Sequence, residues 1–147
     1  MKASCTAEAS AGIETVRLAC GGHGYMTCSN LPLLYGLATA ACTYEGENTV
    51  LLLQTARFLV KQYQGAKSGQ KMTPTVEYLR EVGQMPERGW ENTMESILLG
   101  FKEVAAGKVK LATENLDKRQ RGGLSYEDAW NMTSIELTQC AEVILSS

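Results

Sequence analysis

Features that mark whole classes of protein are missing from this sequence of 147 residues. The net charge is −2 and there is no dense basic block, which argues against binding to nucleic acid or to an anionic membrane surface. No apolar run is long enough to cross a bilayer, and the N-terminus lacks the charged and apolar regions of a signal peptide. The sequence therefore predicts neither membrane insertion nor a nucleic-acid partner.

Metal ligands and paired cysteines are also scarce. The chain has 1 histidine and 5 cysteines, and no Cys-x-x-Cys pair occurs. His23 lies between Cys20 and Cys28, but this spacing supplies no fourth ligand, so a packed or hydrogen-bonded histidine is the better interpretation. We predict no metal site, and we expect the cysteines to be reduced, mostly buried thiols of an intracellular protein.

Strand patterns and internal repeats are absent, whereas helical periodicity runs through most of the chain. Apolar residues three or four positions apart predict a helix over residues 3–20, with Glu14 and Arg17 facing away and Gly21 ending it. The apolar run of residues 50–63 predicts a helix that is buried on nearly all sides within a bundle. Residues 26–41 are less regular and predict only a short helical piece. The fold class is all-α.

The second half of the chain predicts three further helices. One is short and covers about residues 73–83, and a long amphipathic helix follows over about residues 91–119. The apolar stripe of the long helix comprises Met94, Ile97, Leu98, Phe101, Val104, Ala105, Leu111 and Ala112. The last helix begins at a capping box formed by Ser125 and Asp128, and it carries Trp130 as a core anchor. The polar, glycine-containing residues 65–71 are the best candidate for a domain boundary.

Two acidic residues precede the most apolar helix, in the segment Cys42-Thr-Tyr-Glu-Gly-Glu-Asn-Thr-Val50. A carboxylate such as Glu45, at the mouth of a buried helix, is a candidate general base. Desolvation raises the pKa of a carboxyl group, whereas a helix N-terminus stabilises its anion. Judged by spacing alone, simple capping of the helix by Glu45 or Glu47 is the better interpretation.

Three glycines cluster in the segment Gly21-Gly-His-Gly-Tyr25. Gly21, Gly22 and Gly24 allow backbone conformations and close approaches that side chains would prevent. The loop can let a ligand such as a phosphate lie against the main chain, or it can be a tight turn between packed elements. Spacing alone favours the tight turn.

Four dense segments follow one another in the first half of the chain: Arg17-x-x-Cys-Gly-Gly-His-Gly-Tyr25, Ser29-Asn-Leu-Pro32, Cys42-Thr-Tyr-Glu-Gly-Glu-Asn-Thr-Val50 and Leu53-Gln-Thr-Ala-Arg-Phe-Leu-Val-Lys61. These segments, in this order, resemble peroxisomal acyl-CoA oxidases. The resemblance is dense over about residues 11–63 and looser from Thr73 onward, where Asn115-Leu-x-Lys118 and Ala129-Trp-Asn-x-Thr-Ser134 are similar to the additional C-terminal helical domain of the oxidases.

The resemblance implies an FAD enzyme of fatty-acid β-oxidation that desaturates acyl-CoA to trans-2-enoyl-CoA and passes the electrons to O2, giving H2O2. Glu45 matches the family's base, which removes the α-proton while the β-hydrogen leaves as hydride to flavin N5. Gly21, Gly22 and Gly24 match a glycine loop that approaches FAD, often across the interface of a homodimer. Tyr44 is expected to line the acyl-CoA channel.

Two departures from related proteins bear on this reading. Related acyl-CoA dehydrogenases commonly carry Gln and Thr where this chain has Leu18 and Glu47, which favours an oxidase. Family members have several hundred residues, so we expect a fragment that is inactive alone. Residues 1–64 would end the catalytic bundle, and residues 65–147 would form part of the C-terminal helical domain.

The resemblance also implies a peroxisomal location, although the last residues offer no Ser-Lys-Leu-type signal. Two alternatives stay open at this point. One is a non-catalytic helical module for dimerisation or assembly. The other is a fragment of an acyl-CoA dehydrogenase, which would hand its electrons to a protein acceptor.

Overall fold

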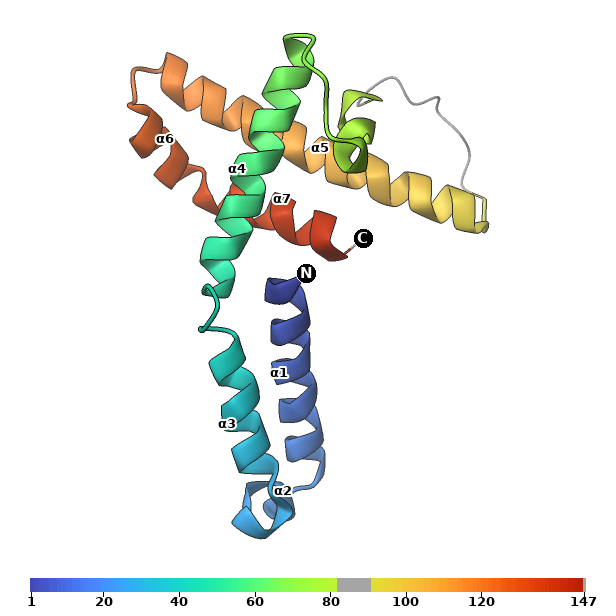
Figure 1. The fold of residues 1–147 in the computed structure, drawn as a ribbon, viewed down its shortest axis with the longest axis vertical. Helices are drawn as coiled ribbons and strands as arrows, with labels where there is room; N and C mark the ends of the chain where they lie inside the picture. The colour runs from blue at the N-terminus through green and yellow to red at the C-terminus, as the bar shows by residue number, and fades with distance from the viewer. Residues whose placement is uncertain (82–90, 147) are drawn as a thin grey trace. The chain divides into compact units, whose positions relative to one another are not determined.

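Every regular element of the described chain is helical, which confirms the all-α prediction (Figure 1). The computed structural model describes residues 1–81 and 91–146, and no strand occurs within these ranges. No helix in the same ranges is long and apolar enough to cross a membrane. In chain order the elements are α1 (Lys2–Ala19), α2 (Gly22–Tyr25), η1 (Thr27–Ser29), α3 (Leu31–Ala41), α4 (Asn48–Lys67), η2 (Pro74–Glu81), α5 (Met94–Arg121), α6 (Tyr126–Met132) and α7 (Ser134–Ser146).

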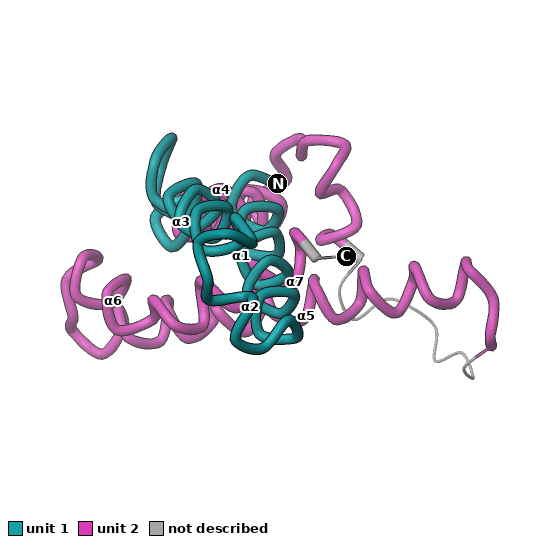
Figure 2. The backbone as a smooth tube through the Cα atoms, turned by 90° about the horizontal axis from the view of Figure 1, so that it is seen from below, with its two compact units in different colours: residues 1–51 teal, residues 52–147 magenta. Residues whose placement is uncertain are grey.

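The chain forms two compact units (Figure 2). The first covers Met1–Leu51 and the second covers Leu52–Ser147, so the division falls within the span of α4. The domain boundary expected between residues 64 and 65 separates the two domains that the family resemblance implies. The compact units are defined by internal contacts, so they do not test that boundary, which stays a prediction.

In the first unit, α1 packs along α3, with α2 and η1 between them in the chain (Figure 1). The sequence predicted only a short helical piece here, but α3 has 11 residues. Pro32 lies near the N-terminus of α3, where its missing N–H costs no intrahelical bond, and the prediction was wrong because the helix continues through Gly36 to Ala41. Asn30, at φ 60°, supplies the left-handed start of this helix, a conformation that asparagine tolerates.

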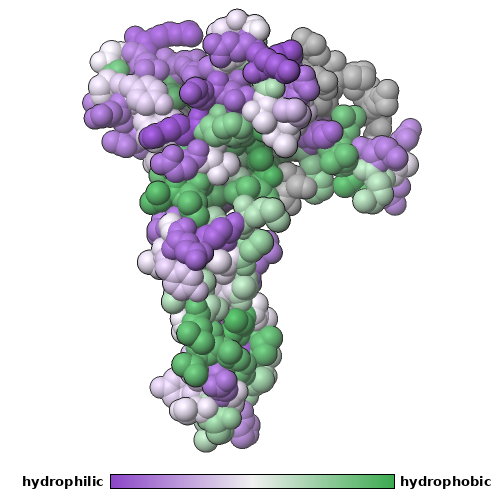
Figure 3. Space-filling view, in the orientation of Figure 1, coloured by the Kyte–Doolittle hydropathy of each residue, from purple (hydrophilic) through white to green (hydrophobic). Residues whose placement is uncertain are grey.

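The apolar side chains of α3 are not covered within this unit. No residue of α3 is buried, and Leu33, Leu34 and Leu37 are exposed. Figure 3 shows the hydrophobic side chains gathered on the surface over this helix. A helix that is apolar on most of its surface is typical of the interior of a larger bundle.

The second unit has its own hydrophobic core, to which five elements contribute. Trp130 is only 8% exposed, which confirms its role as a core anchor, and the Arg57 guanidinium lies 5.3 Å from the centroid of its ring. The fully buried large side chains of this core include Leu59 of α4, Leu79 of η2, Val109 and Leu116 of α5, and Leu137 and Cys140 of α7.

Two predicted apolar faces differ from the observed ones. The buried residues of α4 are Ala56, Leu59, Val60 and Tyr63, whereas Val50 and Phe58 are 52% and 42% exposed. The prediction that α4 is buried on nearly all sides is therefore wrong for the described chain, because its partners cover one face only. In α5 the buried residues begin at Ala105, so the expected stripe is exposed over its first turns, at Met94, Leu98 and Phe101.

The helices of the second unit begin largely where local chemistry predicts. Thr93 caps α5 by accepting a hydrogen bond from the Ser96 backbone N–H at 3.2 Å. Ser125 accepts the Asp128 N–H at 3.1 Å and donates to Asp128 Oδ2 at 2.7 Å, which confirms the capping box. The short helix after residue 73 is a 3-10 helix, η2, and its predicted end near residue 83 lies outside the described residues.

The predicted last helix is divided in two at Thr133. Arg119 Nη1 donates to Thr133 Oγ1 at 2.7 Å, and Arg119 Nη2 donates to Glu136 Oε1 at 3.1 Å. Thr133 Oγ1 in turn donates to the Ala129 carbonyl at 2.6 Å. A side chain from α5 therefore stabilises the junction of α6 and α7, where the sequence has no glycine or proline to announce a break.

The cysteines are more exposed than predicted. Cys5, Cys20 and Cys28 are exposed, Cys42 is half-buried and only Cys140 is buried. The expectation of mostly buried thiols is therefore wrong for three of the five. All five are unpaired in the structure.

Alkylation of the native chain should leave Cys140 unmodified. Burial raises the pKa of its thiol to about 11, so the reactive thiolate is scarce at pH 8 and increases only as the pH approaches that value. After brief treatment with iodoacetamide, peptide mass spectrometry should find Cys5, Cys20 and Cys28 labelled. The denatured chain, as the control, should be labelled at all five cysteines. Labelling of native Cys140 as fast as Cys20 would contradict the buried environment.

Candidate functional site

The turn between α3 and α4 carries Glu45 in an unusual backbone conformation. Glu45 has φ 58° and Gly46 has φ 96°, so two consecutive residues are left-handed. Glycine adopts this conformation without cost, whereas a glutamate there costs about 1–3 kcal/mol. The backbone N–H of Asn48 closes the turn by donating to the Cys42 carbonyl at 3.2 Å. Backbone strain of this kind is concentrated at functional sites, so it makes Glu45 a candidate functional residue.

The two carboxylates of the turn have different environments. Glu47 Oε2 accepts a hydrogen bond from the Val50 backbone N–H at 3.1 Å. Hydrogen bonds from the Thr49 and Val50 backbone lower the pKa of Glu47, which therefore caps α4 as an anion. Glu45 is exposed, and no hydrogen bond or ion pair joins its carboxylate to another described residue. Capping is confirmed for Glu47, and the catalytic role of Glu45 stays a prediction.

Residues of α1 form hydrogen bonds with the Glu45 turn at Gly46 and at Asn48. Lys2 Nζ donates to the Gly46 carbonyl at 2.6 Å and to Asn48 Oδ1 at 2.9 Å. Asn48 Nδ2 donates to the Ala3 carbonyl at 3.0 Å and to Thr6 Oγ1 at 3.1 Å. No local pattern predicts these contacts, since they join residues more than 40 positions apart.

The three glycines of the predicted cofactor loop are not equivalent. Gly24 is buried, and a Cβ built on it would lie 1.8 Å from the Arg17 carbonyl oxygen, so the close approach of α2 to α1 requires glycine here. Gly21 and Gly22 are exposed, and no heavy atom lies within 4 Å of a Cβ built on either. The geometry gives Gly24 a packing role and leaves the main chain of Gly21 and Gly22 open to a ligand.

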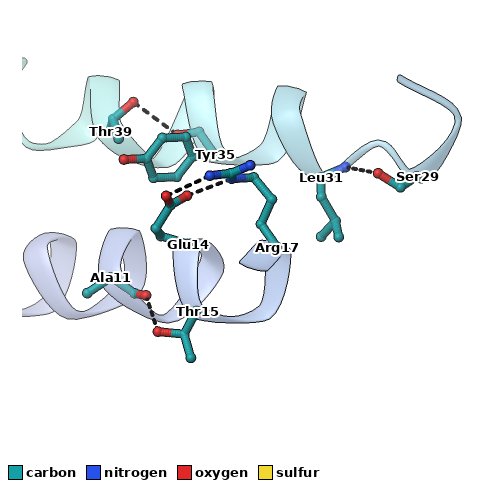
Figure 4. Close-up of polar contacts among 8 residues, drawn as sticks. All are labelled: Ala11, Glu14, Thr15, Arg17, Ser29, Leu31, Tyr35 and Thr39. Atoms are coloured by element: carbon teal, nitrogen blue, oxygen red, sulfur yellow. Dashed lines mark hydrogen bonds and ion pairs between the residues drawn. The ribbon is translucent and has the colours of Figure 1, made fainter. Parts of the chain in front are cut away.

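A charged pair fixes the end of α1 beside this loop (Figure 4). Arg17 donates from Nε and Nη2 to the two carboxylate oxygens of Glu14, each at 2.7 Å, and its guanidinium carbon lies 5.8 Å from the centroid of the Tyr35 ring. Arg17 therefore turns toward α3, and the expectation that it faces away is wrong. The hydrogen bonds lower the pKa of Glu14 and raise that of Arg17.

The remaining candidates are exposed. The Tyr44 side chain, next to Glu45, is 56% exposed. His23 is also exposed, and its side chain makes no hydrogen bond to a described residue, so the expectation of a packed or hydrogen-bonded histidine is wrong for the described chain. Among the described residues no group of three or more histidine, cysteine, aspartate or glutamate side chains could hold a metal ion.

Comparison with known proteins identifies the family to which this chain is related. The profile of the family described as "Acyl-CoA oxidase, C-alpha1 domain" matches residues 1–60, the part that carries both the glycine loop and the Glu45 turn. Acyl-coenzyme A oxidase 1 of Drosophila melanogaster is 49% identical over 144 residues, an alignment that covers 97% of this chain. The chain belongs to the acyl-CoA oxidase family. Peroxisomal acyl-coenzyme A oxidase 1 of Homo sapiens is 42% identical over 152 residues.

Solved acyl-CoA oxidases share the fold as well. Acyl-CoA oxidase-2 of Caenorhabditis elegans, crystallised with FAD, ascaroside-CoA and ATP, matches with a TM-score of 0.88 at 36% identity over 97% of this chain. The tomato acyl-CoA oxidase matches with a TM-score of 0.88 at 32% identity over 99% of this chain. The chain spans only about a fifth of these relatives: 22% of the Drosophila oxidase, 23% of the human one and 22% of the C. elegans structure.

Proposed function

We propose that this chain supplies the catalytic base and part of the flavin-binding surface of an FAD-dependent acyl-CoA oxidase. The reaction desaturates acyl-CoA to trans-2-enoyl-CoA and reduces O2 to H2O2. One observation carries the proposal: in a chain of this family, Glu45 presents a carboxylate with no partner among the described residues, from a turn whose backbone is left-handed at two consecutive residues. A group that accepts the substrate proton needs free lone pairs on its oxygens, and its side chain must extend from a backbone that is held in one position.

Glu45 is the proton acceptor in this proposal. Its carboxylate removes the α-proton of the thioester, while the hydrogen leaves the β-carbon with its electron pair, so that a carbon–carbon double bond forms. FAD, when bound, supplies the hydride-accepting and oxygen-reducing chemistry. Glu47 does not compete for the role, because its carboxylate is engaged at the N-terminus of α4. A bound acyl chain that excludes water from this site would also remove competing hydrogen bonds between water and the reacting groups.

The glycine loop fits a flavin in part. Gly21 and Gly22 expose main chain that has no side chain above it, so a dinucleotide can approach closely. Gly24 does not fit this role directly, because the Arg17 carbonyl occupies the space beside its Cα. In the proposal, Gly24 sets the position of the loop, and Gly21 and Gly22 contact FAD. A homodimer, in which the loop serves the partner's flavin, belongs to the same proposal.

The substrate surface is proposed to include Tyr44, whose exposed ring adjoins Glu45 in the chain. The relative from Caenorhabditis elegans was crystallised with ascaroside-CoA, which supports a CoA thioester as the substrate class. A peroxisomal location is proposed because the human relative is named as peroxisomal. The exposed leucines of α3 favour a second candidate function, a non-catalytic assembly module.

A chimera tests the proposal. In it, this chain replaces the matching segment of the Drosophila oxidase, which is 49% identical, and its flavin content is measured first. We expect acyl-CoA-dependent oxygen consumption and peroxide without an added acceptor. We expect the isolated chain to retain no flavin once free FAD has been removed by gel filtration, and to be inactive. A flavin-loaded chimera that works only with an artificial electron acceptor would indicate a dehydrogenase. A flavin-loaded chimera without any turnover would favour the assembly module.

A further inference from the structure

We propose that Asn48 is a positioning residue for Glu45: its side-chain amide, together with Lys2, ties the Glu45 turn to the first turn of α1. This inference rests on the proposed function, because it assigns Asn48 a role in the same reaction. It adds a residue that does not touch the reacting atoms and acts through the backbone of the turn.

Both faces of the Asn48 amide are used. Its Nδ2 donates to the Ala3 carbonyl at 3.0 Å and to Thr6 Oγ1 at 3.1 Å, and its Oδ1 accepts from Lys2 Nζ at 2.9 Å. Thr6 Oγ1 donates onward to the Lys2 carbonyl at 2.9 Å. An asparagine is the side chain that can donate and accept in this way, whereas aspartate would lose the bond to the Ala3 carbonyl.

The same lysine reaches the residue that follows Glu45. Lys2 Nζ donates to the Gly46 carbonyl at 2.6 Å, and the Asn48 N–H donates to the Cys42 carbonyl at 3.2 Å. The backbone of the turn is therefore held at Cys42, at Gly46 and at Asn48, on both sides of Glu45. The contact surface is partly protected from water, since Ala3 is buried and Lys2, Thr6 and Asn48 are half-buried.

Asn48 is free for this task because another residue caps the helix. Asparagine at the start of a helix commonly accepts backbone N–H groups of the first turn. Here Glu47 accepts the Val50 N–H, and the Asn48 side chain points instead to α1. A left-handed glutamate followed by a left-handed glycine persists only where surrounding contacts determine the backbone, and these contacts come from Asn48 and Lys2.

The test uses Asn48→Ala in the chimera defined above, with Asn131→Ala as the matched control. Asn131 is exposed in α6. We expect Asn48→Ala to lower kcat per bound flavin about 10- to 100-fold, because a base displaced by about 1 Å loses this much. The flavin content and the KM for acyl-CoA should change by no more than about twofold. Hydrogen–deuterium exchange of the peptide spanning residues 42–49 should speed up, and Asn131→Ala should change none of these quantities.

A second pair of variants covers the case in which Asn48→Ala does not fold. Lys2→Met removes the bond to the Gly46 carbonyl and should also lower kcat per bound flavin, whereas Lys2→Arg keeps a donor and should restore it. The outcome for Glu45→Gln separates the two proposals. If Glu45→Gln stays active, the proposed function fails. If Glu45→Gln is inactive but Asn48→Ala keeps its kcat per bound flavin, only the positioning role fails, even where Tm and flavin content fall.

Discussion

Glu45→Gln is expected to abolish desaturation while leaving FAD bound. The substitution keeps the volume of the side chain and its polarity, but it removes the group that takes the α-proton. General bases contribute about 10²- to 10⁴-fold to a rate, so the first-order rate of flavin reduction should fall by at least that range. Because the Glu45 carboxylate has no partner among the described residues, its removal leaves no buried group unsatisfied. The melting temperature of the variant should therefore stay close to that of the unsubstituted chimera.

The measurement is anaerobic reduction of the flavin by acyl-CoA, followed in a stopped-flow spectrometer after flavin content has been confirmed. Glu47→Gln is the matched control, since it makes the same chemical change two residues away. Its amide oxygen can still accept the Val50 N–H, so α4 keeps its cap and reduction should proceed. A Glu45→Gln enzyme that reduces its flavin at a near-normal rate would show that another group is the base.

Local chemistry made much of the fold predictable. The glycine pair after residue 20 predicted the end of α1, and Ser125 with Asp128 predicted the start of α6. Such signals are complete within a few residues of sequence, because a cap or a helix stop involves only its own turn. The class, the position of the long α5 and the location of the Glu45 turn followed from signals of this kind and from the family resemblance.

The features that could not be predicted depend on contacts between distant residues. Thr133 ends α6 with Arg119 as its partner, 14 positions away, and Asn48 meets Thr6 across 42 positions. Periodicity located the apolar positions of α5 but not the half of the helix that its neighbours cover, so Phe101 is exposed although it lies in the predicted stripe. At the site, the sequence located Glu45 and Glu47 but did not distinguish the cap from the unpartnered carboxylate.

Gly24→Ala is expected to be the most disruptive of the glycine substitutions. The added Cβ would lie 1.8 Å from the carbonyl oxygen of Arg17 and 2.8 Å from its carbonyl carbon. Both atoms belong to the backbone, so no side chain can turn aside to relieve the contact, and α2 must separate from the end of α1. Overpacking of this kind costs about 1–3 kcal/mol and occasionally more. Thermal unfolding of the chimera should show a lower Tm, with loss of flavin as a consequence.

Gly22→Ala is the control that assigns the loop its role. Nothing lies within 4 Å of a Cβ built on Gly22, and its backbone is not left-handed, so alanine should fit without loss of Tm. If the Gly22 main chain contacts FAD, that methyl group occupies the space of the cofactor, and flavin content should fall while the protein stays folded. Equal flavin content in Gly22→Ala and the unsubstituted chimera would leave only the packing role of Gly24. The loop would then be a tight turn, and the flavin contacts would have to come from another part of the enzyme.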